Sequence, residues 1–226
     1  MKKTVIFIIL AIIAIALFLA LGGLRGENAG ESNSAMAVLA GSPVTTIEAG
    51  EYSADILKSE LRWEADKPLI SSYRDSGTIA LSSGALKVAS DGSYDGLFVI
   101  DMNSINTVST GVGRGQENLT KHLKSADFFD VEQFPTSEIK ISKIEAVEGG
   151  KHLVFGDLTI KGVSNPVIFS TELKKDGDAL VALGEVEVDR TLWNIKYGSG
   201  RFFENLGDKM IDDSFRLFLS VTLLKK

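Results

Sequence analysis

Two hydrophobic patterns divide the chain. Residues 5–24 form an apolar run that no charged side chain interrupts. As a helix this run would span about 30 Å, the thickness of the hydrocarbon core of a bilayer. From about Ile47 onward, apolar and polar positions alternate with a period of two, which is typical of β-strands with one buried and one wet face. The patterns predict an N-terminal transmembrane helix followed by an all-β domain.

The predicted strands are of two kinds. In the first kind one face is apolar and the other is polar, as in residues 59–66, 137–142 and 184–190. In the second kind both faces are apolar, as in residues 96–102, 152–162, 166–173 and 215–224. A strand with two apolar faces avoids water on both sides, so one face packs on a core and the other on a helix, a ligand or another sheet.

Turn-forming pairs separate these strands at short intervals. They include Asp91-Gly92, Gly149-Gly150, Asn165-Pro166 and Asp176-Gly177. Such pairs favour tight reversals of the chain. About eight antiparallel strands with short connections predict a closed barrel or a sandwich rather than a parallel α/β sheet.

One short helix interrupts the strand pattern. Residues 119–129 carry apolar side chains at helical spacing, Pro135 marks a break, and period two begins at Glu138. We therefore expect a short helix, a turn and then a strand, with His122 on the polar side of the helix. The junction also holds three aromatic side chains that are suited to plugging the end of a sheet, Phe128, Phe129 and Phe134.

The N-terminal run predicts export of the β domain. Lys2 and Lys3 precede the run and should stay cytoplasmic. The run exceeds the roughly 7–15 apolar residues of a typical signal peptide, which favours an uncleaved signal anchor over residues 1–24. A cleaved signal peptide stays open, because residues 20–22 have an A-x-A-like spacing. Residues 25–46 are polar and aperiodic, so we expect a flexible linker before a domain at residues 47–226.

Composition narrows the classes of function. The net charge is −6, and an acidic body repels phosphate backbones, so no nucleic-acid partner is expected. The chain has no cysteine, which excludes disulfides, thiolate metal sites and a cysteine nucleophile. We expect no cofactor and no metal.

Candidate catalytic groups are few. His122 lies within reach of Asp127, Asp130 and Glu132 in the sequence, so a general base held by a carboxylate is one interpretation. No G-x-S-x-G nucleophile elbow occurs in the chain, and a surface or capping histidine is the favoured interpretation.

Two other clusters have weak chemical signals. Asp208, Asp212 and Asp213 are of the type that binds hard cations, but they lack the EF-hand spacing, so turn acids are favoured, one of them paired with Arg190. Residues 111–115, GVGRG, lack the spacing of a phosphate-binding loop and predict a flexible loop.

Aromatic side chains gather in residues 189–208. Trp193, Tyr197, Phe202 and Phe203 stand there among three glycine-hinged turns. The segment is either ordinary core at a barrel rim or the lining of a mouth through which an apolar ligand enters.

Several of these segments together resemble the YceI-like family of exported, polyisoprenoid-binding, lipocalin-like proteins. The matching segments are KSELRW (58–63), GLFVIDMNSI (96–105), HLKSADFFDVEQFPTSEIKI (122–141), GDLTIKGVSNPVIF (156–169) and DRTLWNIKYGSGRFFENLGDKMIDDSF (189–215). One stretch departs from the pattern of the family, since Tyr73-Arg74 stands between Trp63 and Gly77 in place of a histidine-containing run.

The resemblance implies an eight-stranded antiparallel barrel with a short side helix and a long prenyl chain inside. Alternation then suggests which side chains line the interior, although a shift of one residue would invert each set. The predicted lining consists of Phe98, Ile100, Met102, Ile139, Ile141, Leu158, Ile160, Phe169, Val186, Val188, Trp193, Tyr197 and Phe203.

The predicted function is an exported, membrane-tethered carrier of isoprenoid lipids, either polyprenyl or quinone-type, that performs no chemistry. Its location would be the extracytoplasmic side of the cytoplasmic membrane, or the periplasm or exterior if residues 1–24 are cleaved. Two alternatives stay open: a ligand-free structural or stress-response module of the envelope, and a lipid-modifying enzyme that uses His122. The sequence does not choose between a monomer and a homodimer.

Overall fold

The computed structural model describes residues 45–111 and 115–226. These residues belong to one compact unit, Gly41–Lys226. The predicted membrane segment at residues 5–24 and almost all of the predicted linker lie outside the described residues. Within the described part, no helix has the length and apolar character needed to cross a bilayer.

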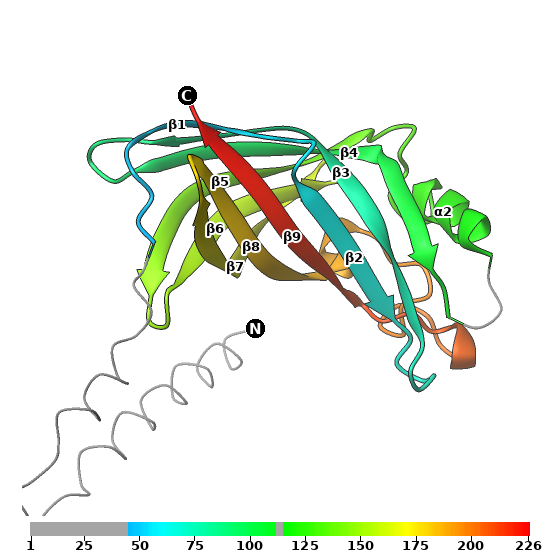
Figure 1. The fold of residues 1–226 in the computed structure, drawn as a ribbon. Coiled ribbons are helices and arrows are strands. Elements are labelled where there is room, and N and C mark those ends of the chain that lie inside the picture. The colour runs from blue at the N-terminus through cyan, green and yellow to red at the C-terminus, as the bar shows by residue number, and fades with distance from the viewer. Residues whose placement is uncertain (1–44, 112–114) are drawn as a thin grey trace, which may run out of the picture. The chain divides into compact units, whose positions relative to one another are not determined.

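Nine strands and one α-helix make up the described part of the chain (Figure 1). The strands are β1 Gly50–Ala54, β2 Glu60–Asp66, β3 Arg74–Val88, β4 Tyr94–Ser109, β5 Thr136–Val147, β6 Lys151–Ile160, β7 Val163–Asp176, β8 Ala179–Asp189 and β9 Ser214–Lys225. The α-helix is α2, Gln116–Lys124, and two short 3-10 turns are η2, Arg190–Trp193, and η3, Gly207–Lys209.

The nine strands close into an antiparallel barrel with eight strand positions. From β3 to β9, each strand pairs with the next in the chain. Both β1 and β2 then pair with β3 on one side and with β9 on the other, at different heights. They are therefore two halves of one strand, interrupted at residues 55–59. This architecture confirms the predicted all-β, eight-stranded barrel with one short helix.

The interruption between β1 and β2 has a local cause. The carboxylate of Asp55 accepts hydrogen bonds from the backbone N–H groups of Leu57 and Lys58, at 3.2 and 3.3 Å. The hydroxyl of Ser59 donates to the carbonyl of Asp55 at 2.7 Å. Asp and Ser side chains that bond to nearby backbone offer the chain an alternative to the ladder, so the strand breaks here and resumes at Glu60.

The helix is shorter than the sequence pattern predicts. It ends at Lys124 rather than near residue 129, and residues 126–129 lie in turns. It buries Leu119 and Leu123, while His122 is partly exposed on its side. Strand β5 begins directly after Pro135, as a proline break predicts.

The barrel has two different ends (Figure 1). One end, which we call the helix end, carries α2 and the segment 190–213 between β8 and β9. The opposite end, which we call the hairpin end, carries the β3–β4, β5–β6 and β7–β8 turns. Side chains with period two point into the barrel between these ends, as on β6, where Val154, Leu158 and Ile160 are buried.

Candidate functional site: an apolar interior in two chambers

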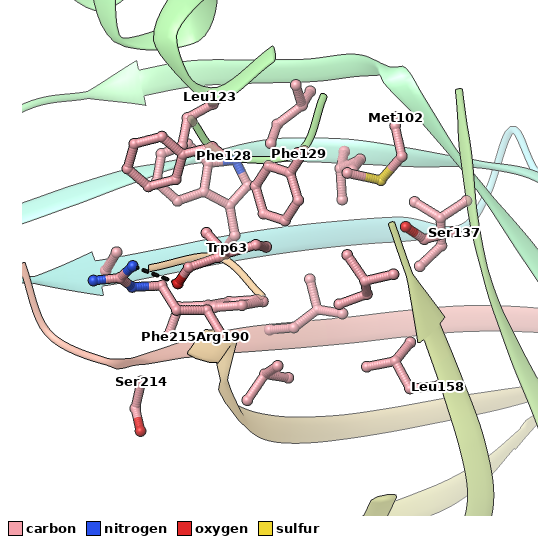
Figure 2. A pocket seen from close by; sticks show the side chains of 18 of the residues that line it. Trp63, Met102, Leu123, Phe128, Phe129, Ser137, Leu158, Arg190, Ser214 and Phe215 are labelled. Carbon is pink, nitrogen blue, oxygen red and sulfur yellow. Dashed lines mark hydrogen bonds between the residues drawn. The ribbon is translucent and has the colours of Figure 1, made fainter. Parts of the chain in front are cut away.

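The interior of the barrel contains two cavities. The helix-end chamber is shown in Figure 2. Measured as the space that the centre of a water molecule can occupy, its volume is about 100 Å³, and that of the hairpin-end chamber is about 110 Å³. Both chambers are lined by four of the same side chains, Ile100, Leu158, Val188 and Leu217. These four come from β4, β6, β8 and β9 and lie between the two chambers, and we call them the waist.

The hairpin-end chamber is almost entirely hydrocarbon. It is lined by 23 residues, and the single polar side chain among them is the hydroxyl of Thr171. Leu81, Phe98, Phe169 and Val221 are typical members of the wall, and all are buried. A cavity of this kind can hold an apolar chain, but it offers almost no hydrogen bonds to water or to a polar ligand.

The helix-end chamber is apolar as well, but four polar residues contribute to its wall. They are Ser137, Arg190, Asp212 and Ser214, labelled in Figure 2 except for Asp212. The rest of the wall is aliphatic and aromatic, with Trp63 on β2 and with Phe128 and Phe129 in the turns after α2. The predicted plug of aromatic residues therefore includes two side chains that line a chamber.

Arg190 is the positively charged member of this wall. Its guanidinium is buried and donates to the backbone carbonyls of Ile195, Ile211 and Asp212, at 2.8, 3.2 and 2.9 Å. Its Nη2 lies 3.7 Å from a carboxylate oxygen of Asp213. Burial lowers the pKa of Arg190 from its ordinary value, and the carboxylates of Asp213, Asp189 and Asp212 oppose that shift.

Trp63 has an unsatisfied donor. Its indole Nε1 is one of three buried side-chain nitrogen or oxygen atoms that have no hydrogen-bond partner among the described residues; the others belong to His152 and Asp213. Trp63 pairs with Gly77 on β3, where an added Cβ would lie 1.9 Å from the carbonyl oxygen of Asn106 and 2.6 Å from the indole ring. The glycine thus lets the indole pack directly against the backbone of β3.

Ten of the thirteen side chains predicted to line the interior do so. Their role in ligand binding stays a prediction. They are Phe98, Ile100, Met102, Ile139, Ile141, Leu158, Ile160, Phe169, Val186 and Val188.

The other three predicted lining residues lie elsewhere. Trp193 is buried, but its indole N–H donates to the carbonyl of Leu158 at 3.0 Å and it lines neither chamber. Tyr197 and Phe203 are 41% and 50% exposed on the segment between β8 and β9. This part of the prediction was wrong, because an irregular segment has no period two that could assign its aromatic side chains to a face.

Most of the residues that line the two chambers were not predicted from the sequence patterns. Leu61, Trp63 and Ala65 form the dry face of a strand pattern, and that signal alone would have placed them inside. Strand β9 contributes six residues, but Phe218 and Leu224 make its other face partly apolar as well, which weakens the alternation as a signal. Nothing in the sequence marks Arg190 as part of a cavity wall.

His122 and Asp127 do come together. The Nε2 of His122 lies 3.3 Å from a carboxylate oxygen of Asp127, and its ring contacts the edges of Phe128 and Tyr197, at centroid distances of 4.9 and 4.7 Å. The pair lines neither chamber, since Phe128 faces the cavity in this region. A histidine and an acid at this distance can exchange a proton, but here they have no contact with the interior.

The acidic cluster near the C-terminus is held by arginines. Asp213 lies 3.7 Å from Arg190 and 3.3 Å from Arg201, as the preference for turn acids predicted. The carboxylate of Asp212 accepts from the backbone N–H of Ser214 at 3.1 Å. In the part of the chain that the structure describes, no three His, Asp or Glu side chains are grouped so that they could hold a metal ion.

Comparison with known proteins identifies similar chains. The profile of the YceI-like domain matches residues 52–223. The UPF0312 protein of Photorhabdus laumondii is 33% identical over 91 residues, which are 37% of this chain and 47% of that protein. Protein YceI of Salmonella arizonae is 31% identical over 94 residues, which are 38% of this chain and 48% of that protein. The aligned segment thus spans about half the length of these curated relatives.

Two solved structures share the fold. BcnA of Burkholderia cenocepacia superimposes with a TM-score of 0.58 at 19% identity, over 75% of this chain and 98% of that one. A polyisoprenoid-binding domain of Saccharophagus degradans, implicated in plant cell wall breakdown, superimposes with a TM-score of 0.55 at 13% identity, over 77% and 98%. At such identities the similarity concerns the fold alone.

Proposed function

Because this chain belongs to the YceI-like family, we propose that it is an exported binding protein that holds a long isoprenoid lipid, of polyprenyl or quinone type, inside its barrel. It carries the lipid without changing it. The observation that carries this proposal is the hairpin-end chamber, whose wall offers a ligand hydrocarbon and one hydroxyl. The ligand that fits such a wall is an apolar chain.

The energetics favour a chain of several isoprene units. Each unit moved out of water contributes up to roughly 4 kcal/mol, from about 0.8 kcal/mol for each of its five carbons. Ordering the chain and losing its free motion cost part of this gain. A few buried units therefore suffice for roughly micromolar binding without any polar anchor.

The solved relative from Saccharophagus degradans supports the same class of ligand, since it is described as a polyisoprenoid-binding domain and shares the barrel. The shared waist of Ile100, Leu158, Val188 and Leu217 adds a second point of support. Two chambers in series suit a long, thin molecule better than a compact one.

The proposal includes a location. The apolar run at residues 5–24 would anchor the chain, with the barrel on the extracytoplasmic side of the membrane. A carrier tethered beside a bilayer stays close to the membrane that contains its lipid. Cleavage after the run would instead release the barrel to the periplasm or the exterior.

Mass spectrometry of the organic extract from full-length protein, purified from a host that exports it, tests the proposal. A prenyl lipid in near-stoichiometric amount is the expected result. Ile160→Glu, which places a carboxylate in the wall of the helix-end chamber, should abolish lipid retention. Thr159→Glu is the matched control, because the neighbouring position on β6 lines neither chamber.

Both variants are first compared by circular dichroism and thermal melting, so that lipid content is scored on folded protein. A folded Ile160→Glu variant with unchanged lipid content would contradict the proposed site. Wild-type protein free of lipid would instead favour a structural module of the envelope.

The 3.3 Å contact between His122 and Asp127 supports one alternative, a lipid-modifying enzyme. It predicts conversion of the bound lipid that is lost in His122→Ala. Extracts in which both proteins carry the same unmodified lipid would exclude that alternative.

A further inference from the structure

Exposed aromatic side chains gather at the helix end of the barrel. Tyr197, Phe202 and Phe203 are 41%, 45% and 50% exposed. They are the only exposed aromatic side chains among the described residues, and all three lie in the segment between β8 and β9. Because soluble proteins seldom gather exposed apolar groups without a partner, the cluster indicates an interaction surface.

A second loop extends this surface. Leu69, in the turn between β2 and β3, is 58% exposed. The turn lies beside the aromatic segment at the helix end (Figure 1), since the Nζ of Lys67 donates to the carbonyl of Asp208 at 2.9 Å. The backbone N–H of Asp212 donates to the carbonyl of Asp66 at 3.1 Å. We call this surface the apolar rim, and it consists of Leu69, Tyr197, Phe202 and Phe203.

The segment that carries the three aromatic residues also forms part of the chamber wall. Ile195 and Ile211 belong to it and line the helix-end chamber. The backbone N–H of Ile211 donates to the carbonyl of Gly198 at 2.8 Å, which joins the two halves of the segment. One side of the segment therefore faces the chamber, and a partner that covers the apolar rim lies next to that chamber.

The charges on the segment favour a bilayer interface over an apolar protein groove. The Nζ of Lys196 lies 4.8 Å from the ring centre of Phe202, and Arg201 is paired with two aspartates. Glu204 follows the phenyl rings and is exposed. A dry groove would leave these charges without water. At the headgroup level of a bilayer, apolar rings enter the acyl boundary while lysine and glutamate keep their hydration.

The chain outside the described residues is long enough for this contact. It enters the barrel at the hairpin end, where Ile47 lines the hairpin-end chamber. Residues 25–44 separate the apolar run from the first described residue and reach at most about 70 Å, at roughly 3.5 Å per residue. The longest strand, β4, has 16 residues and measures about 53 Å at about 3.3 Å per residue. An anchor at residues 5–24 therefore allows the helix end to meet the membrane.

We infer that the apolar rim inserts into a phospholipid bilayer at the level of the headgroups, so that the barrel contacts the membrane with its helix end. This inference rests on the proposed location beside a membrane and adds the surface that touches the bilayer. It places the helix-end chamber, rather than the hairpin-end chamber, next to the membrane.

Spin labelling tests this orientation, because the chain has no cysteine and each introduced cysteine carries the one label. The label is placed at the helix end by Phe203→Cys. The matched control is Leu224→Cys at the hairpin end, an apolar side chain that is 38% exposed. Full-length protein is reconstituted in nanodiscs of phosphatidylethanolamine and phosphatidylglycerol. Electron paramagnetic resonance then compares collisions of the label with oxygen, which concentrates in the bilayer, and with a water-soluble nickel chelate.

The label at position 203 should collide more with oxygen than with the nickel chelate, and the label at position 224 should show the reverse. Adding Leu69→Ser and Phe202→Ser to Phe203→Cys should lower the inserted population at least about tenfold, because two apolar side chains no longer leave water. The control pair is Leu57→Ser with Ile168→Ser, which are 93% and 62% exposed outside the rim. That pair should leave the label in the bilayer. Circular dichroism confirms that each variant is folded.

The outcomes separate this inference from the proposed function, since mass spectrometry measures prenyl lipid in the same samples. A label at position 203 that stays in water on lipid-loaded protein would overturn the inference and leave the carrier function standing. Insertion of the label at position 224 instead would reverse the orientation and overturn it as well. Shielding of position 203 from both reagents, or spin–spin broadening, would mean that a second copy covers the rim. Protein that inserts position 203 but holds no lipid would support the bilayer contact and contradict the carrier function.

Discussion

The imidazole of His152 is buried inside the barrel wall at the hairpin end. It shares the inward face of β6 with Val154 and Leu158 and is 4% exposed. Its Nδ1 has no hydrogen-bond partner among the described residues. Burial lowers the pKa of His152 below its ordinary value, and a hydrogen bond to the backbone of Thr45 opposes that shift. The folded barrel therefore favours the neutral ring.

This burial predicts loss of stability in mild acid. The unfolded chain takes up a proton on His152 near pH 6.5, whereas the folded chain does so only at lower pH. The free energy of unfolding should therefore fall as pH decreases below about 6.5. Urea unfolding at several pH values between about 7.5 and 5 measures this slope.

His152→Gln removes the titrating group and should reduce the slope over the same window. The variant can be less stable at neutral pH without affecting the test, because the comparison is between slopes. Equal slopes in both proteins would show that other groups cause the acid sensitivity.

At the scale of elements, Arg190 ties the segment between β8 and β9 together. Its guanidinium donates to Ile195 within the segment and to Ile211 and Asp212 near the start of β9. Arg201 adds ion pairs to Asp189, at 2.9 Å, and to Asp213, at 3.3 Å. The buried guanidinium of Arg190 thus links the two ends of the irregular segment at the helix end.

Arg190→Lys should destabilise the barrel by about 2–4 kcal/mol, because one ammonium group cannot replace a planar guanidinium that binds three carbonyls. The same change at Arg201 is the matched control. Arg201 is half-exposed, so solvent screens its ion pairs and the loss of stability should be much smaller than at Arg190.

Denaturant unfolding of the two variants measures both effects. Equal losses of stability would mean that the buried carbonyl contacts of Arg190 do not hold the segment.

How much of the site the sequence could predict differs between strands and irregular segments. Strand residues such as Val186 and Val188 could be assigned to the interior, because period two and a single dry face leave one choice. Tyr197 and Phe203 could not, since the irregular segment has no period. The unpaired N–H of Trp63 and the waist are also absent from any sequence pattern, because both depend on which strands face each other across the closed barrel.

At the scale of the whole molecule, the four side chains of the waist, Ile100, Leu158, Val188 and Leu217, lie between the two chambers. A short chain fits in one chamber, but a long chain has to pass the waist. The proposed function therefore predicts that the waist controls the length of chain the barrel accepts.

Val188→Phe tests this control, since a phenyl ring adds volume at the smallest side chain of the waist. The variant should bind a geranyl chain within about threefold of wild type but bind a geranylgeranyl chain at least about tenfold more weakly, because the units beyond the waist lose their burial. Overpacking costs about 1–3 kcal/mol of stability, so binding is compared only on folded protein. The measurement is titration with prenyl alcohols of increasing length.

Val181→Phe makes the same change on the same strand at a position that lines neither chamber. It should leave the dependence on chain length unchanged. If Val188→Phe binds long chains as well as wild type does, then the chain does not thread both chambers, and the lipid occupies one chamber alone. If binding of both chain lengths weakens equally, the phenyl ring disturbs the whole interior, and the waist does not select ligands by length. A selective loss of the longer chains is the outcome that a two-chambered, threaded interior requires.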